Sequence, residues 1–181
     1  MTPSAQDPLA DARLAALRRA LARLAPPPAP PRELEAAVAL LLRPGTDLDV
    51  LLIRRARHDS DPWSGHVALP GGRRDPADTD LSATARRETL EEVGLDLDRI
   101  GRQLGRLQPV APASPRLPSL SITPYVFAVE PGHELTLDER EVDAAVWVPL
   151  AELHDERAAG EILIEIEGGA HRFPSLTYGD Y

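Results

Sequence analysis

Two neighbouring segments decide how this chain folds: Leu69-Pro70-Gly71-Gly72-Arg73-Arg74-Asp75 and Ala85-Arg86-Arg87-Glu88-Thr89-Leu90-Glu91-Glu92-Val93-Gly94-Leu95. The second segment predicts a helix from about residue 82 to residue 93, which Gly94 ends. At about 100° per residue, one third of the helix circumference holds Glu88, Glu91 and Glu92. The opposite side gathers Ala83, Leu90 and Val93. We therefore expect one apolar face that packs on the core and one face of carboxylates.

The three glutamates repel one another, because like charges three or four residues apart destabilise a helix by roughly a few tenths of a kcal/mol per pair. A bound cation would remove this cost. Mg²⁺ takes oxygen ligands and is held by one or two carboxylates together with substrate phosphates. Gly71 and Gly72 let the backbone approach closely, so a loop carbonyl is a further candidate ligand. Arg87 is a candidate to fix a carboxylate without touching the substrate.

An exposed, solvated helix face is the alternative explanation for Glu91 and Glu92 taken alone. The glycine loop and the Arg87-Glu88 pair favour the metal site. The whole combination resembles the signature of the Nudix hydrolases: a glycine loop, then Arg-Glu, two further glutamates and a final Gly-apolar pair. The resemblance extends from about Val38 to Phe173, and its central motif covers residues 72–95.

This resemblance implies an α/β/α sandwich around a mixed sheet, and hydrolysis of a nucleoside diphosphate linked to another moiety. It also implies that Mg²⁺ or Mn²⁺ is bound through Glu88, Glu91 and Glu92 with the Gly71 carbonyl. The loop over residues 73–80 has one additional residue before Arg87, and Asp78 stands at the early acidic position. In this longer spacing and in its Asp75-Pro76 pair, the loop resembles the coenzyme A diphosphatase branch, which implies 3′,5′-ADP and 4′-phosphopantetheine as products.

Two alternatives to coenzyme A stay open. The same chemistry would serve a nucleoside triphosphate, a dinucleotide or an ADP-ribose type substrate. A non-catalytic nucleotide-binding module is the other alternative, which loss of the motif glutamates would favour. Residues 63–70 match the coenzyme A branch only in part, since Leu69 stands where an aromatic residue is usual.

The chemistry we expect is attack of a water, activated by the metal, on one phosphorus while the second phosphate leaves. Only a modest general base is then needed. The loop carboxylates Glu139 and Glu141 are candidates, and Glu91 or Glu92 could serve instead. An acidic surface loop is the plainer explanation of Glu139 and Glu141.

Arginines near the glycine loop are candidates to bind substrate phosphates. Four are selected for this role: Arg54, Arg55, Arg73 and Arg74. Balancing the nearby aspartates is the alternative role for each of them.

The rest of the chain predicts one Nudix-type domain with an added N-terminal helix. Residues 8–24 form an amphipathic pattern, and a proline-rich connector over residues 25–31 cannot continue that helix. We expect residues 1–31 to be an appendage, packed on the domain or on a second subunit, and residues 32–181 to be the domain. Further expected strands are 34–42, 50–54, 103–110, 122–129, 145–148 and 161–167. The resemblance implies an apolar helix after the equivalent of Tyr178, for which the N-terminal helix is a candidate substitute.

Composition excludes several classes of function. The net charge of −9 argues against a general nucleic-acid binder, which needs a basic surface. With no Cys, thiol chemistry and thiolate zinc sites are excluded. We find neither a signal core nor a run of about 18 apolar residues, and so expect a cytoplasmic protein without a membrane partner. The expected partner is a small nucleotide-like molecule, and a homodimer stays open.

Overall fold

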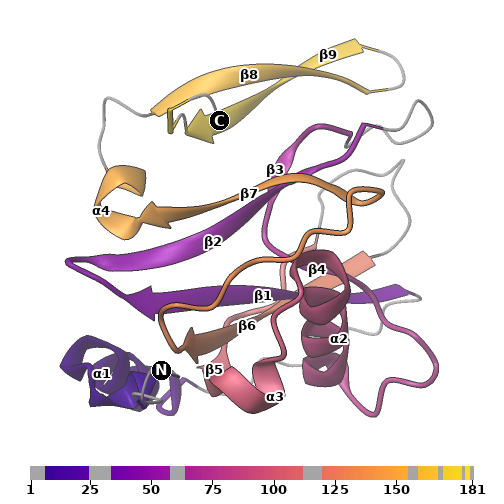
Figure 1. The fold of residues 1–181 in the computed structure, drawn as a ribbon. Helices are drawn as coiled ribbons and strands as arrows, with labels where there is room; N and C mark the ends of the chain where they lie inside the picture. The colour runs from indigo at the N-terminus through magenta and orange to yellow at the C-terminus, as the bar shows by residue number, and fades with distance from the viewer. Residues whose placement is uncertain are drawn as a thin grey trace.

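A seven-stranded mixed sheet forms the centre of the computed structural model, which describes residues 7–24, 34–57, 64–111, 120–154, 159–166, 169–176 and 178–179 (Figure 1). The strands are β1 (Leu34–Pro44), β2 (Leu48–Arg55), β3 (Val67–Ala68), β4 (Gly71–Arg73), β5 (Gly101–Arg106), β6 (Leu120–Val129) and β7 (Val142–Pro149). Their order is β3-β2-β1-β6-β5, with β4 paired to β1 and β7 paired to β2. β1 and β6 are parallel and the other pairs are antiparallel, so the expected mixed sheet is confirmed.

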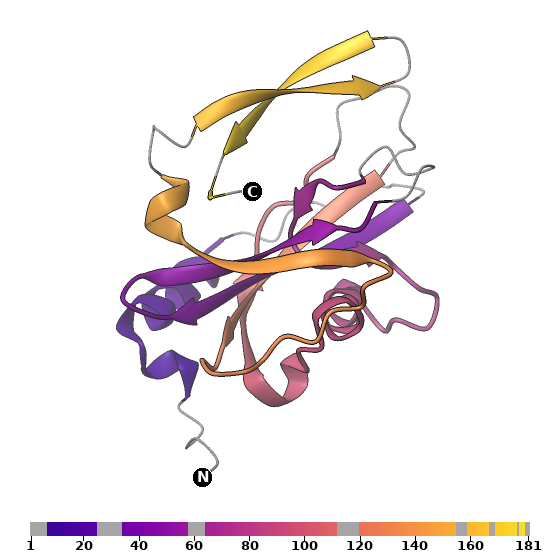
Figure 2. The same ribbon diagram turned by 45° about the horizontal axis from the view of Figure 1, so that its top comes forward.

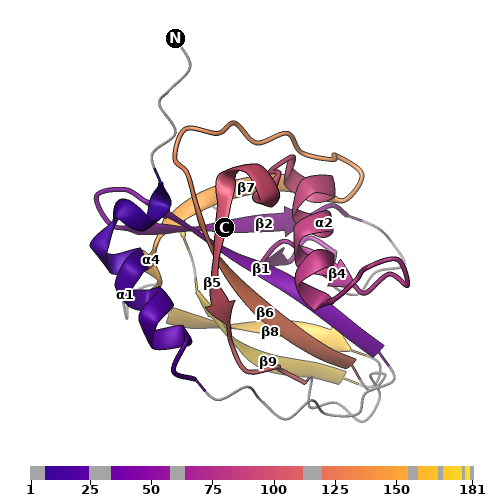
Figure 3. The same ribbon diagram turned by 90° about the horizontal axis from the view of Figure 1, so that it is seen from below.

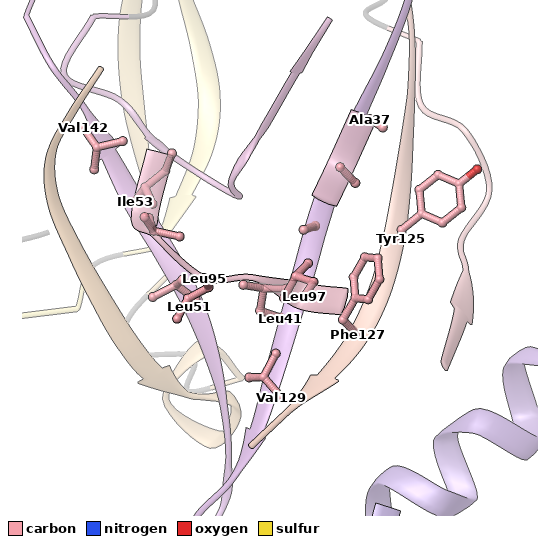
Figure 4. Close-up of a cluster of buried hydrophobic side chains, with 13 residues drawn as sticks. Ala37, Leu41, Leu51, Ile53, Leu95, Leu97, Tyr125, Phe127, Val129 and Val142 are labelled. Atoms are coloured by element: carbon pink, nitrogen blue, oxygen red, sulfur yellow. The ribbon is translucent and has the colours of Figure 1, made fainter. Parts of the chain in front are cut away.

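One face of the sheet packs against α2 (Leu81–Val93) and α3 (Leu97–Ile100). Side chains alternate along a strand, and β1 accordingly sends Ala37, Ala39 and Leu41 to this face. They pack with buried residues of the other strands, among them Phe127 from β6, as Figure 4 shows. This core fixes α2 over the middle of the sheet.

The other face is covered at one end by α1 (Ala12–Leu21), which follows the short 3-10 helix η1 (Pro8–Ala10) (Figure 3). Leu14 and Leu21 of α1 are buried in a second core cluster. A Cβ at Gly105 would lie 2.7 Å from the Leu21 Cβ, so the glycine permits this close approach. Helices therefore lie on both faces, and the expected α/β/α sandwich is confirmed. The N-terminal helix packs on the domain of its own chain.

α2 begins one residue before its predicted start and ends as predicted, but its apolar face is rotated from the predicted one. The Asp80 side chain accepts from the Ala83 N–H at 2.8 Å, and Gly94 takes a left-handed conformation at φ +73°. Ala85 and Val93 are fully buried, and Glu92 lies on the same buried side. The prediction that Leu90 belongs to the core is wrong, because the residue is 50% exposed.

The predicted loop over residues 57–80 contains β3 and β4. β4 pairs through its backbone with Ala36, Ala37 and Val38 of β1, and its two glycines leave no side-chain pattern to predict it. The strand expected at 103–110 is β5, followed by an isolated bridge from Val110 to Ile122. The connector at 25–31 and most of the proline-rich loop around residue 115 lie outside the described residues.

The chain ends with α4 (Leu150–Leu153) and a hairpin of β8 (Ala159–Ile166) and β9 (Gly169–Leu176), which Figure 2 shows apart from the central sheet. The expected strand at 161–167 corresponds to β8, whereas β9 is not predicted. Among the described helices, none combines the length and the apolar character that crossing a bilayer requires.

Candidate functional site

Three carboxylates meet where α2, β4 and the start of β7 lie together. One carboxylate oxygen each from Glu88, Glu92 and Glu141 lies within 4.8 Å of the others. Glu92 is only 3% exposed, Glu88 is partly buried, and Glu141 is exposed to solvent. We call these three residues the carboxylate group. It joins two predicted metal ligands to a residue predicted as a general base.

Gly71 and Gly72 of β4 lie against two of these carboxylates. The Gly71 N–H donates to Glu92 Oε2 at 2.9 Å, which fixes the buried carboxylate against the strand. A Cβ at Gly72 would lie 2.5 Å from Glu88 Oε1, so the Glu88 carboxylate occupies the space that a side chain would take. The prediction that the Gly71 carbonyl binds a metal stays a prediction, and the amide of the same residue orients Glu92.

Glu141 reaches the group because its loop is bonded to the end of α2. The Thr136 N–H donates to the Val93 carbonyl at 3.0 Å, and the Asp138 N–H donates to the Glu92 carbonyl at 3.1 Å. Carbonyls in the last turn of a helix have no partner within the helix, so they are available to this loop. The Glu141 N–H then donates to the Asp138 carbonyl at 2.9 Å, which closes a turn directly before β7.

The guanidinium of Arg87 makes all of its contacts with other groups of the protein. Asp78 accepts from Nε at 3.1 Å and from Nη2 at 3.0 Å, and the Arg73 carbonyl accepts from Nη2 at 3.1 Å. Nη1 lies 2.8 Å from Glu91 Oε2 and 2.9 Å from Glu88 Oε1. These five contacts match the five N–H groups of arginine. Arg87 is therefore placed to orient carboxylates.

Glu91 lies apart from the carboxylate group. Its side chain is 53% exposed and paired with Arg87 one helical turn earlier, at i,i+4. The structure thus brings together Glu88 and Glu92 from the predicted trio and adds Glu141. A metal role for Glu91 stays a prediction, and it requires the side chain to leave Arg87.

The four predicted phosphate-binding arginines lie in different surroundings. Arg54 pairs with Asp143 at 2.9 Å, and Arg74 pairs with Glu35 at 2.9 Å. Arg73 is exposed beside the glycine pair. Arg55 is opposite Val142 in the register of β2 and β7, and its positive charge lowers the pKa of Glu92. The charge of Arg55 thus acts on the buried carboxylate.

Electrostatics of the group favour a bound cation. The pKa of Glu92 is raised to about 8, mainly by burial and in addition by the charges of Glu88 and Glu141, while the Gly71 N–H and Arg55 act in the opposite direction. Burial also raises the pKa of Glu88, against the opposing effect of Arg87. Hard carboxylate oxygens converging with excess negative charge fit Mg²⁺ or Mn²⁺, because these ions take oxygen ligands. The residues present therefore fit the implied metal.

The raised pKa of Glu92 predicts how the metal-free protein responds to pH. A carboxyl whose pKa rises on folding binds its proton more tightly in the folded chain, so the free energy of unfolding falls as pH rises from about 5 to about 8. In EDTA, we expect the Tm of the wild type to fall, relative to that of Glu92→Gln, as the pH rises across this range. A constant difference in Tm between the two proteins would contradict it.

A separate surface cavity of about 590 Å³ lies at the start of α2 and is not part of this site. Its lining includes Arg86, whose guanidinium is bonded to Asp98 at 2.9 Å and to Gln103 at 3.2 Å. None of the three carboxylates lines it. Arg86 and Arg106 both bond to other residues of the lining, so the carboxylate group is the better candidate for chemistry.

Sequence comparisons place this architecture in a known family. Residues 32–164 match the NUDIX domain. Protein C14C4.10c of Schizosaccharomyces pombe is 39% identical over 145 residues, covering 70% of this chain and 44% of that protein. The Nudix hydrolase NudL of Photorhabdus laumondii is 33% identical over 122 residues, covering 67% of this chain and 63% of that protein. The chain thus spans less than two thirds of the length of these relatives.

Solved structures share the fold. A Caenorhabditis elegans Ap4A hydrolase complex aligns with a TM-score of 0.53 at 20% identity, covering 66% of this chain and 82% of that one. The NUDIX domain of Shewanella oneidensis NrtR, complexed with ADP ribose, aligns with a TM-score of 0.50 at 24% identity, covering 75% and 84%. At these identities the likeness concerns the fold. With the match over residues 32–164, the chain belongs to the NUDIX domain family.

Proposed function

We propose that this chain is a metal-dependent hydrolase that cuts the diphosphate linkage of a nucleoside diphosphate derivative. The observation that supports it most is the carboxylate group, in which three acidic side chains converge within 4.8 Å in a member of the NUDIX family. The NudL relatives are themselves named Nudix hydrolases. All three motif glutamates are present, so nothing in the sequence favours a module without catalysis.

A bound divalent cation would neutralise charge on the diphosphate oxygens and lower the pKa of a coordinated water. Glu88 and Glu92 are the proposed ligands. Gly72 leaves space for the Glu88 carboxylate, and the Gly71 N–H holds that of Glu92. In the reaction the water oxygen bonds to one phosphorus, and the bond from that phosphorus to the bridging oxygen breaks. The second phosphate leaves with the electron pair.

Glu141 is the proposed acceptor of the water's proton. Its side chain is exposed and comes from a separate element, so it can face both the substrate and solvent. Arg87 supports the step indirectly, because it holds Glu88 at 2.9 Å and is fully bonded within the protein. Glu91 is a third proposed ligand, available when its side chain leaves Arg87.

Coenzyme A is the substrate that we infer first. The support is the loop over residues 73–80, which resembles the coenzyme A diphosphatase branch in its length and in its Asp75-Pro76 pair. Arg55 is the proposed diphosphate contact, because its charge already acts on the carboxylate group. Arg54, Arg73 and Arg74 are proposed contacts for more distant phosphates, and an additional ribose phosphate distinguishes coenzyme A from ordinary dinucleotides.

A substrate panel tests the proposal. Coenzyme A, ADP-ribose, NADH, diadenosine polyphosphates and nucleoside triphosphates are each incubated with Mg²⁺ or Mn²⁺, and the products are separated by chromatography. We expect coenzyme A to be cut fastest, into 3′,5′-ADP and 4′-phosphopantetheine, with Glu92→Gln as the background control. Preference for another diphosphate would discard coenzyme A and keep the hydrolase. Inactivity on every compound would overturn the proposed function.

A further inference from the structure

Thr84 is a buried polar residue of α2 that the proposed chemistry does not use. It is fully buried, and its hydroxyl donates to Asp78 Oδ2 at 2.8 Å. A threonine in a helix commonly bonds the carbonyl of the preceding turn instead. The carbonyl available to Thr84, that of Asp80, lies at 3.5 Å, so the carboxylate is the closer acceptor.

Asp78 is held from several directions at once. Its Oδ2 also accepts from the Asp75 N–H at 2.9 Å, and both of its oxygens accept from Arg87. The hydrogen bonds from Arg87, Asp75 and Thr84 hold the pKa of Asp78 down at about 2, although its burial acts in the opposite direction. Asp78 is therefore a fixed anion, against which the planar guanidinium of Arg87 is set.

Arg87 in turn contacts two glutamates of the proposed metal site. The edge of the guanidinium that does not contact Asp78 lies 2.9 Å from Glu88 Oε1 and 2.8 Å from Glu91 Oε2. A continuous chain of polar contacts thus runs from the Thr84 hydroxyl through Asp78 and Arg87 to Glu88. Its two ends lie one helical turn apart on α2, with the intermediate acid supplied by the preceding loop.

We propose that Thr84 is a positioning residue of the metal site, whose hydroxyl fixes Asp78 so that Arg87 holds Glu88 in a ligand orientation. This inference rests on the proposed function, since it assumes that Glu88 binds a metal. The hydroxyl restrains rotation of the Asp78 carboxylate, which would otherwise turn with Arg87. Mutation of a group that orients a metal ligand typically weakens metal binding by roughly 10- to 100-fold.

Thr89 provides a matched control on the same helix. It is also fully buried, but its hydroxyl donates to the Ala85 carbonyl at 2.7 Å, away from Asp78 and Arg87. Thr84→Val and Thr89→Val each remove one buried hydroxyl and preserve the side-chain shape. Both substitutions therefore lower stability, whereas only the first breaks the contact chain to Glu88.

The test is a titration with Mn²⁺ in the absence of substrate, in which electron paramagnetic resonance measures the concentration of the free ion. We expect Thr84→Val to raise the Kd for Mn²⁺ about tenfold, and Thr89→Val to change it less than about twofold. Thr84→Ser keeps the hydroxyl and should retain wild-type affinity. In turnover assays, the activity of Thr84→Val should recover as the metal concentration is raised to saturation, because the proposed defect lies in metal affinity.

Equal Kd values for the two valine variants would overturn the positioning role and leave the proposed function standing. A wild type that neither binds Mn²⁺ nor hydrolyses any diphosphate would instead overturn the proposed function. Folding is followed by Tm and near-ultraviolet circular dichroism. If either valine variant fails to fold, the same comparison is made between Thr84→Ala and Thr89→Ala, and equal affinities there overturn the inference too.

Discussion

Replacing Glu92 by Gln is expected to lower kcat by about 10³-fold and to leave the fold intact. Gln keeps an oxygen that can accept from the Gly71 N–H, now 2.9 Å from Glu92 Oε2. The lost feature is the negative charge at the most buried corner of the carboxylate group. The measurement is steady-state hydrolysis at saturating metal, together with Tm in EDTA.

Tm distinguishes a chemical defect from a folding defect in this variant. Glu92 has a raised pKa because burial disfavours its charge, so the neutral Gln should be tolerated at least as well in the metal-free protein. Glu152→Gln, an exposed change on α4, is the matched control and should have wild-type activity. Glu91→Gln is also expected to lower turnover by orders of magnitude. Wild-type activity in both Glu91→Gln and Glu92→Gln would contradict the assignment of these residues to the active site.

The sequence predicts the architecture well where side-chain patterns are strong. α2 has a capping aspartate, a terminal glycine and helical spacing, and its observed bounds differ from the predicted ones by one residue. The predicted α/β/α sandwich and mixed sheet are confirmed. The sequence does not predict β4, because two of its three residues are glycine and only backbone pairing with β1 defines the strand. The packing of α1 on the sheet depends on Leu14 and on the space left by Gly105. No local sequence pattern predicts that these two residues meet at one interface.

Helix spacing alone limits what the sequence can say about the site. It places Glu88, Glu91 and Glu92 on one side of α2, but it does not show that Arg87 draws Glu91 away from the other two. Nor does it show which loop residue joins them, because Glu141 arrives through hydrogen bonds between backbone groups. Leu90 illustrates the same limit, since the buried side of α2 is set by the sheet beneath it and includes Glu92. Thr84 could not be found because its acceptor, Asp78, lies in the preceding loop.

The second large effect is expected at Gly72, where Ala should weaken metal binding without unfolding the chain. The new Cβ would lie 2.5 Å from both Cδ and Oε1 of Glu88, and its three nearest atoms all belong to that carboxylate. A carboxylate is the flexible end of a side chain, so it can move aside at small cost to stability. The displaced Glu88 would then be lost as a ligand. We expect the Kd for Mn²⁺ to rise roughly 10- to 100-fold, with a comparable loss of activity at low metal concentration.

Gly71→Ala is the informative contrast, because the neighbouring glycine meets backbone instead. A Cβ there would clash with the Ala37 carbonyl oxygen and lie 2.6 Å from the Val38 Cα, and its φ of +151° is one that side chains rarely adopt. Neither obstacle can rotate away, since both belong to β1 at the centre of the sheet. Gly71→Ala should therefore lower Tm strongly, whereas Gly72→Ala should keep a Tm near that of the wild type. If both variants lost Tm equally, Gly72 would be a structural glycine of β4, and the idea that it makes room for Glu88 would be wrong.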